Sequence, residues 1–204
     1  MKKELVNIET WKRKTHYNFF KNFDEPFLGI TANVDCRKTF EEAKDMKKSF
    51  FLTYLYKSLQ VVNTIPAFAL RIDKGKVYRY DRVDAAPTIG RRDHTFGYSF
   101  MKYYEDEEKF MRLAKKEVAR VQATTTLEPA TNNENVIHYT TVPWIHFTGL
   151  SHARVFGDSV PKIAFGKMVK VGNQLLMPVA VHAHHALVDG YDVGQFFELF
   201  RKLL

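Results

Sequence analysis

"HAHHALVDGYDVG", residues 182–194, places three histidines within four positions and then turns at Asp189-Gly190. The apolar stretch at residues 175–185 predicts a strand, on which alternate side chains face opposite sides. His182 and His184 therefore share one face of the strand, while His185 faces the other. The segment after the turn, "YDVGQFFELFRKLL", carries apolar residues at helical spacing. The sequence thus predicts a histidine-bearing strand that turns sharply into a helix.

Three interpretations of these histidines are open. His182 and His184 form a same-face pair that would suit a metal ion, but zinc needs further ligands and nothing in the sequence nominates one. The histidines could equally be hydrogen-bonded structural residues. His185 ends a strand beside a turn, where a side chain can meet substrate. A neutral imidazole there can accept a proton from a hydroxyl near neutral pH, and no nucleophilic serine motif stands nearby.

The remaining segments predict a mixture of helices and strands. Tight turns, such as the one at Asp73-Lys74-Gly75-Lys76, join several consecutive strands, which indicates a mixed or mostly antiparallel sheet. Helices are expected over residues 39–64 (in two parts, ended by Pro66), 105–123 and 191–204. Strands are expected over residues 27–35, 68–81 (a hairpin), 86–104 (a pair), 136–141, 144–149 and 162–185 (a hairpin around Gly172-Asn173). We therefore expect an α+β fold, a two-layer sandwich with helices packed on one side of the sheet. No linker divides the chain, so residues 1–204 are expected to form a single domain.

Composition limits the function classes. With 45% apolar residues in 204, the chain can bury a core, and the single cysteine, Cys36, leaves no internal disulfide. No apolar run follows the basic pair of "MKKELVNIETW" or is long enough to span a bilayer, which predicts a soluble cytoplasmic protein. The net charge of +8 comes from scattered lysines and arginines. This pattern disfavours nucleic acid and membrane partners and leaves a phosphate-bearing small ligand open.

Three motifs carry a resemblance to a known family. "HHALVDG" at 184–190 fits the HHxxxDG motif that chloramphenicol acetyltransferases share with the catalytic domain of dihydrolipoyl acyltransferases. "WKRKTH" at 11–16 resembles the Trp-x-Arg-x-x-His start of chloramphenicol acetyltransferases. "TTVPWIHF" at 140–147 is similar to their S-x-x-PW-x-x-F segment. The likeness to this family runs in the same order over nearly the whole chain.

The resemblance implies an acetyl-CoA-dependent O-acetyltransferase that acetylates, and so inactivates, the antibiotic chloramphenicol. His185 would be the general base that takes the proton of the acceptor hydroxyl, with its tautomer fixed by its own backbone carbonyl. Asp189 would form a buried ion pair with Arg13 that shapes the site. Thr140 would replace a serine that donates a hydrogen bond to the tetrahedral oxyanion, keeping the hydroxyl but adding a stiff methyl group.

The resemblance also implies binding sites and an assembly. Acetyl-CoA would serve as co-substrate, with no metal, and would pass near Trp144 and Lys167. The acceptor would meet aromatic side chains, although such a cluster is equally ordinary in a core; the candidates are Phe19, Phe20, Phe96 and Tyr98. The protein would be a homotrimer with active sites at its subunit interfaces. Segment 148–161 departs from the family, because it places polar His152 and Arg154 where apolar pocket residues are expected.

Several alternatives remain beside this interpretation. An acetyltransferase of the same fold could act on another small alcohol or amine. A non-catalytic homologue could bind a small molecule, although the combination of His185, Asp189 and Arg13 argues against it. A metal enzyme built on His182 and His184 is a more distant possibility, and metal analysis of the protein would test it.

Overall fold

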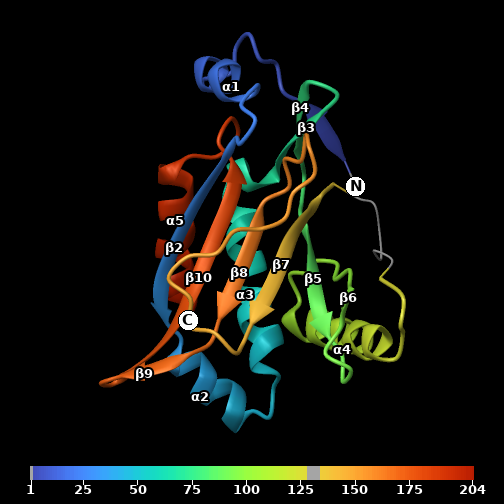
Figure 1. Ribbon diagram of the computed structural model, residues 1–204, viewed down its shortest axis with the longest axis vertical. Helices are drawn as coiled ribbons and strands as arrows, with labels where there is room; N and C mark the ends of the chain where they lie inside the picture. Colours follow the sequence, from blue (N-terminus) through green and yellow to red (C-terminus); the bar gives the residue numbers. More distant parts are fainter. Residues whose placement is uncertain (1, 128–133) are drawn as a thin grey trace.

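The computed structural model of the protein describes residues 2–127 and 134–204 and shows a sheet with helices on one face (Figure 1). In spatial order, the main sheet contains β2 (Phe27–Asp35), β10 (Gln174–His184), β8 (Lys162–Gly166), β7 (Val136–Val142), β5 (Asp84–Gly90) and β6 (Phe96–Tyr98), and β9 (Val169–Val171) pairs with β10. β10 is antiparallel to β2, β8 and β9, whereas β7 is parallel to both β5 and β8. The predicted two-layer α+β fold with a mixed sheet is confirmed.

The helices are α1 (Lys14–Phe20), α2 (Arg37–Asp45), α3 (Phe50–Thr64), α4 (Glu107–Gln122) and α5 (Gly190–Leu203). Side chains cap the first turns of α3, α4 and α5, whereas α1 and α2 begin without a side-chain cap. The Ser49 side chain accepts a hydrogen bond from the Leu52 N–H at the start of α3, and Asp106 accepts one from the Lys109 N–H at the start of α4. α2 and α3 are the two parts of the helix predicted over residues 39–64, so this prediction is confirmed.

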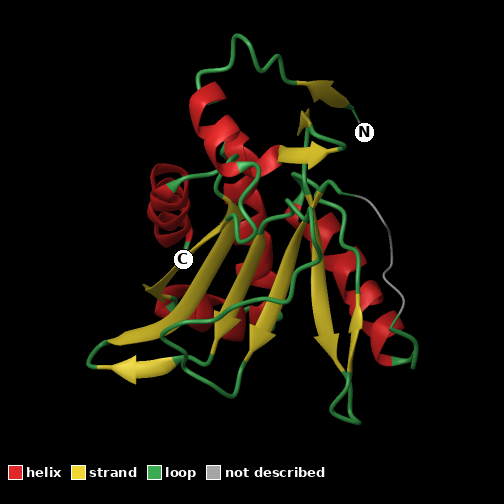
Figure 2. Cartoon of the chain, turned by 45° about the horizontal axis from the view of Figure 1, so that its top comes forward, coloured by secondary structure: helices red, strands yellow, loops and turns green. Residues whose placement is uncertain are grey.

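A second, smaller sheet stands at the α1 end of the molecule (Figure 2). Its strands, in spatial order, are β1 (Lys3–Leu5), β4 (Lys76–Tyr80) and β3 (Leu70–Asp73). The short 3-10 helix η1 (Pro66–Ala69) directly precedes β3. The β3–β4 hairpin turns at Lys74 and Gly75, where positive φ angles of 50° and 74° favour the glycine. The sequence predicted this hairpin but not β1, because β1 has three exposed residues and forms only by pairing with β4.

The long connection between β7 and β8, residues 143–161, contains no helix or strand and runs across the face of the sheet that the helices leave open (Figure 1). The predicted strand at 144–149 is therefore wrong. The chain turns at Pro143-Trp144, and β8 takes the place beside β7. Phe147 of this connection packs on Ala164 and Ala180 of the open face.

The alternation predicted for β10 is confirmed. Val179, Val181 and Ala183 are fully buried in the core beneath the helices. His182 and His184 belong to the opposite face, where they are also buried. Among the described residues, no helix has both the length and the hydropathy needed to cross a bilayer.

Candidate active site

His185 directly follows the last residue of β10 and is held at its backbone and at its ring. Its N–H donates to the Pro26 carbonyl at 2.7 Å, and its ring Nδ1 lies 3.1 Å from the Val188 carbonyl oxygen. A carbonyl can only accept, so Nδ1 carries the proton and Nε2 is left free to accept one. The structure gives Nδ1 the Val188 carbonyl as its partner in place of the predicted carbonyl of His185 itself, which accepts a hydrogen bond from Arg13 Nη2 at 3.2 Å.

The predicted ion pair between Arg13 and Asp189 is present. Arg13 Nη1 donates to Oδ2 of Asp189, while Oδ1 accepts the N–H groups of Tyr191 and Asp192 and so caps α5. Partial burial disfavours the charged carboxylate, but the hydrogen bond and positive charge of Arg13 outweigh it and lower the pKa of Asp189 below its ordinary value. Asp189 thus joins α5 to the segment just before α1.

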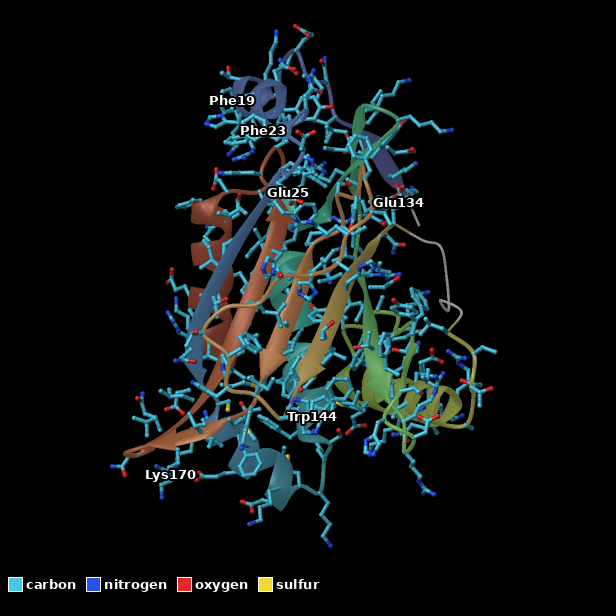
Figure 3. The ribbon with its side chains drawn as sticks, in the orientation of Figure 1. Phe19, Phe23, Glu25, Glu134, Trp144 and Lys170 are labelled. Carbon is cyan, nitrogen blue, oxygen red and sulfur yellow. The ribbon has the colours of Figure 1, made fainter. Side chains whose placement is uncertain are left out.

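Phe20 contacts His185 directly. Its ring is stacked on the His185 imidazole, with centroids 4.1 Å apart and planes 18° from parallel. Phe19 packs edge-on against Phe20 and is 64% exposed, beside Phe23 (Figure 3). Phe20 therefore limits the orientations of the imidazole, and no local sequence pattern predicts this contact.

Thr140 lies in a different place, on the open face of the sheet. It lines a cavity of about 690 Å³ together with Phe96 and Tyr98, two of the predicted acceptor residues. The same cavity is bordered by His138 of β7, by Lys162 of β8 and by the 143–161 connection. The structure thus groups Thr140 with Phe96 and Tyr98, whereas His185, Phe19 and Phe20 form a second group.

The two groups are well separated within one chain. The register pairs Thr140 with Ala164, and Ala164 with Ala180, which stands four residues before His184 on β10. Four residues along a strand and two strand spacings across the sheet amount to roughly 16 Å between the backbones of Thr140 and His184. A single chain therefore cannot bring the His185 ring and the Thr140 hydroxyl to one reacting atom.

Trp144 and Lys167 line a further cavity of about 500 Å³, whose walls include the aromatic rings of Phe50, Phe51 and Tyr54. Trp144 lies at the end of the sheet away from Phe19 (Figure 3). Thr88 of β5 lines this cavity and also the Thr140 cavity. The two cavities therefore adjoin at β5 and β7.

The histidines of the open face offer no complete metal site. His184 Nδ1 accepts the Ala186 N–H, and the His182 ring packs edge-on against His152 with centroids 5.0 Å apart. Within residues 2–127 and 134–204, no three His, Cys, Asp or Glu side chains converge as metal ligands would. The geometry gives no support to the metal interpretation of His182 and His184.

Sequence reasoning missed the polar groups around Thr140. His138 stands two residues before Thr140 and so on the same face of β7, and alternation along the predicted strand could have found it. Lys162 of β8 and Asp158 form an ion pair in the wall of the same cavity, with Nζ 2.5 Å from Oδ2. No local pattern brings these residues together, because β7 and β8 are joined by a long irregular connection.

Comparisons with known proteins show which family the whole chain resembles. A family model described as "Chloramphenicol acetyltransferase" matches residues 1–201. A chloramphenicol acetyltransferase from Clostridium perfringens is 28% identical over 100% of this chain and 95% of its own length, and one from Proteus mirabilis is 26% identical over 94% and 89%. A solved chloramphenicol acetyltransferase structure superposes with a TM-score of 0.94 at 30% identity, covering 100% of both chains.

A more distant structure shares the fold alone. The dihydrolipoamide acetyltransferase of Azotobacter vinelandii has a TM-score of 0.66 at 12% identity, over 92% of this chain and 86% of its own. The full-length family match, together with the anchored His185 and the Arg13–Asp189 pair, identifies the relationship. The chain belongs to the chloramphenicol acetyltransferase family.

Proposed function

We propose that residues 1–204 form a single acetyltransferase domain that transfers the acetyl group of acetyl-CoA to a hydroxyl of chloramphenicol and so inactivates the antibiotic. The observation that carries this proposal is the state of His185. Its Nδ1 is bound by a backbone carbonyl and its Nε2 is free to accept a proton. The names of the full-length relatives support the choice of acceptor.

The chemistry needs one base and one oxyanion donor. His185 Nε2 removes the proton of the acceptor hydroxyl as its oxygen attacks the acetyl carbonyl carbon. The Thr140 hydroxyl donates to the oxygen that becomes negative, a contact worth about 100- to 1000-fold in rate. The bond from carbon to sulfur then breaks, and the proton on His185 passes to the sulfur of CoA.

The residues of the Trp144 cavity suit CoA. Its aromatic and methionine walls match the partly apolar pantetheine arm, and the Lys167 side chain offers a positive charge for phosphate. Because this cavity adjoins the one that Thr140 lines, a CoA bound there would have a short route to the reacting centre.

We further propose that the protein acts as a homotrimer whose active sites lie between subunits. The separation of roughly 16 Å between Thr140 and the end of β10 supports this proposal, in which His185 of one copy serves the Thr140 cavity of another. Large apolar side chains that stand exposed on one chain, such as Phe19 and Phe156, supply surface for such contacts.

Subunit mixing tests the shared site. His185→Ala and Thr140→Val chains are each expected to be nearly inactive, but mixed trimers contain interfaces with both residues intact. For random assembly of equal amounts, about one quarter of the interfaces regain activity. Refolding the two variants together should therefore restore thiol release, and the mass in solution should be that of three chains. No recovery in a mixed oligomer would refute the shared site.

Thiol release from acetyl-CoA with chloramphenicol as acceptor tests the reaction itself. We expect rapid release by the protein and by a His94→Asn control, which changes an exposed histidine in a turn. His185→Ala should abolish it. A folded protein that binds CoA but releases no thiol with chloramphenicol would refute the proposed function.

The location and biological effect follow from the co-substrate. Acetyl-CoA is an intracellular metabolite, so we place the reaction in the cytoplasm. Expression in a sensitive bacterium should raise the chloramphenicol concentration needed to stop growth, and the His185→Ala variant should not.

A further inference from the structure

The inner wall of the Thr140 cavity holds a buried charged pair. Lys162 is 3% exposed, and its Nζ lies 2.5 Å from Asp158 Oδ2. Asp158 Oδ1 in turn accepts the N–H of Val160. A charged pair is costly to bury unless its hydrogen bonds are satisfied, and here both partners are well bonded. The wall is thus polar but electrically balanced.

His138 extends this polar group toward Thr140. Lys162 Nζ lies 3.3 Å from His138 Nδ1, and because an ammonium only donates, Nδ1 accepts and the proton sits on Nε2. His138 is exposed to the cavity, but desolvation of its ring at the cavity wall and the charge of Lys162 lower its pKa to about 4, so the ring is neutral near pH 7. His138 and Thr140 share one face of β7 at a spacing of roughly 7 Å. Both can therefore donate a hydrogen bond to one ligand.

A second pair of imidazoles has hydrogen-bonding capacity that the protein leaves unused. His152 Nε2 and His182 Nδ1 are buried and have no hydrogen-bond partner among the described residues. His152 lines the cavity, and its ring meets that of His182 edge-on. An unpaired buried polar atom costs about 1–3 kcal/mol. An apolar ligand would leave the cost at His152, the one of the pair that lines the cavity, in place, whereas a ligand hydroxyl that the His152 ring turns to meet would remove it.

The opposite wall is aromatic. Phe96 and Tyr98 pack edge to face on β6 and are 45% and 40% exposed. They offer apolar ring surface to one side of a ligand, while Glu134 at the rim adds a hydrogen-bond acceptor. Arg154, which also lines the cavity, is already paired with Glu25. The cavity therefore combines donors, an acceptor and an aromatic wall without uncompensated cations.

From this combination we infer that the cavity also takes neutral polyhydroxyl acceptors of the hexopyranoside class and favours them over apolar alcohols. The inference rests on the proposed acetyl transfer. One sugar hydroxyl oxygen attacks the acetyl carbonyl carbon, its proton goes to His185 Nε2, the carbon–sulfur bond breaks, and the same proton is returned to the CoA sulfur. The products are a sugar acetate ester and CoA.

Acceptor competition tests the inference. Thiol release is measured with methyl and 4-nitrophenyl hexopyranosides and with 3-phenyl-1-propanol, a primary alcohol without further hydroxyls, and mass spectrometry identifies the ester. We expect at least one hexopyranoside to show about tenfold higher kcat/KM than the propanol, since a site built for hydroxyls discriminates against their absence. Equal or better use of the propanol would overturn the inference.

Cavity variants separate hydrogen bonding from mere space. His138→Phe and His152→Leu should each lower kcat/KM for the hexopyranoside about tenfold or more relative to phenylpropanol. His138→Gln, which keeps an N–H donor, should retain most of the preference, and His94→Asn should retain all of it. Circular dichroism checks that each variant is folded. An unchanged ratio in folded His138→Phe and His152→Leu would overturn the inference.

The failure of this inference differs from failure of the proposed function. Acetylation of chloramphenicol without preference for any hexopyranoside would leave the acetyltransferase intact and refute the acceptor class. Calorimetric titration of the hexopyranosides into His185→Ala, which keeps the cavity but lacks the base, measures acceptor binding independently of catalysis. Binding that His152→Leu weakens would support the acceptor class even if no thiol were released. No binding of any of these sugars would refute it.

Discussion

Replacing Arg13 by methionine tests the link between the ion pair and the base. The change removes the guanidinium that pairs with Asp189 and donates to the His185 carbonyl. Breaking a buried ion pair costs about 3–5 kcal/mol, because the remaining charge is left without a partner. The Arg13 side chain is 12% exposed but that of Asp189 is 32% exposed, so water compensates part of this cost. We therefore expect a loss of about 2–3 kcal/mol in the free energy of unfolding, measured by urea titration.

The same variant has a predictable pH dependence. The pKa of Asp189 is lower in the folded protein than its ordinary value of 3.8, so its ion pair contributes stability above that value. This contribution is lost as the pH falls through the lowered pKa. The stability difference between the protein and Arg13→Met should therefore be constant between about pH 5 and pH 7 and should narrow below about pH 4.

Activity and a matched control complete the test. Releasing the His185 carbonyl should shift the base enough to lower kcat by about 100-fold. Arg79→Met breaks an ion pair with Glu4 in which both side chains are more than half exposed, and it should change stability by less than about 1 kcal/mol. If Arg13→Met were no less stable than Arg79→Met, or if its deficit were undiminished below about pH 3, the assignment of the ion pair would be wrong.

Three further changes probe separate parts of the molecule. Phe20→Leu removes the ring stacked on His185 and should lower kcat about tenfold in the thiol-release assay while leaving the KM for acetyl-CoA unchanged; an unchanged kcat would contradict a positioning role. Thr140→Val should lower kcat about 100- to 1000-fold with an unaltered circular dichroism spectrum, and Thr140→Ser should keep most activity. An equal loss of activity in both variants would show that the Thr140 hydroxyl does not contribute to the rate. Arg71 is fully buried and its guanidinium donates to four backbone carbonyls. Arg71→Met should therefore lower the free energy of unfolding, measured by urea titration, by about 3–5 kcal/mol. A loss below about 1 kcal/mol would show that water satisfies these carbonyls in place of the side chain.

Local patterns in the sequence were sufficient for much of the fold. The strand predicted over 27–35 has the same bounds as β2, which pairs along its whole length with β10. The Asp189-Gly190 turn lies where it was expected, because an aspartate cap acts within its own helical turn. For the candidate site, the motif resemblance predicted the contact between Arg13 and Asp189, which are far apart in the sequence.

Long-range contacts explain what the sequence did not reveal. β1 depends on β4, and the predicted strand over 144–149 is absent because β8 occupies the position beside β7. The Nδ1 partner of His185 is the Val188 carbonyl, and the carbonyl expected for this role accepts instead from the distant Arg13. The Lys162–Asp158 pair needs the β7–β8 pairing and the irregular connection to be in place first. Each of these depends on how distant segments meet, which periodicity does not encode.

The irregular connection over 143–161 also bears on how this enzyme folds and how it can change. Pairing the parallel strands β7 and β8 closes this segment as a loop, and because it contains no helix or strand we expect it to open at lower free energy than the strands beside it. It nevertheless carries His152 and Arg154, two side chains that line the acceptor cavity. Substitutions there would change the lining of this cavity while the pairing of the strands stays as it is. Acceptor range can therefore evolve in this protein at little cost to folding.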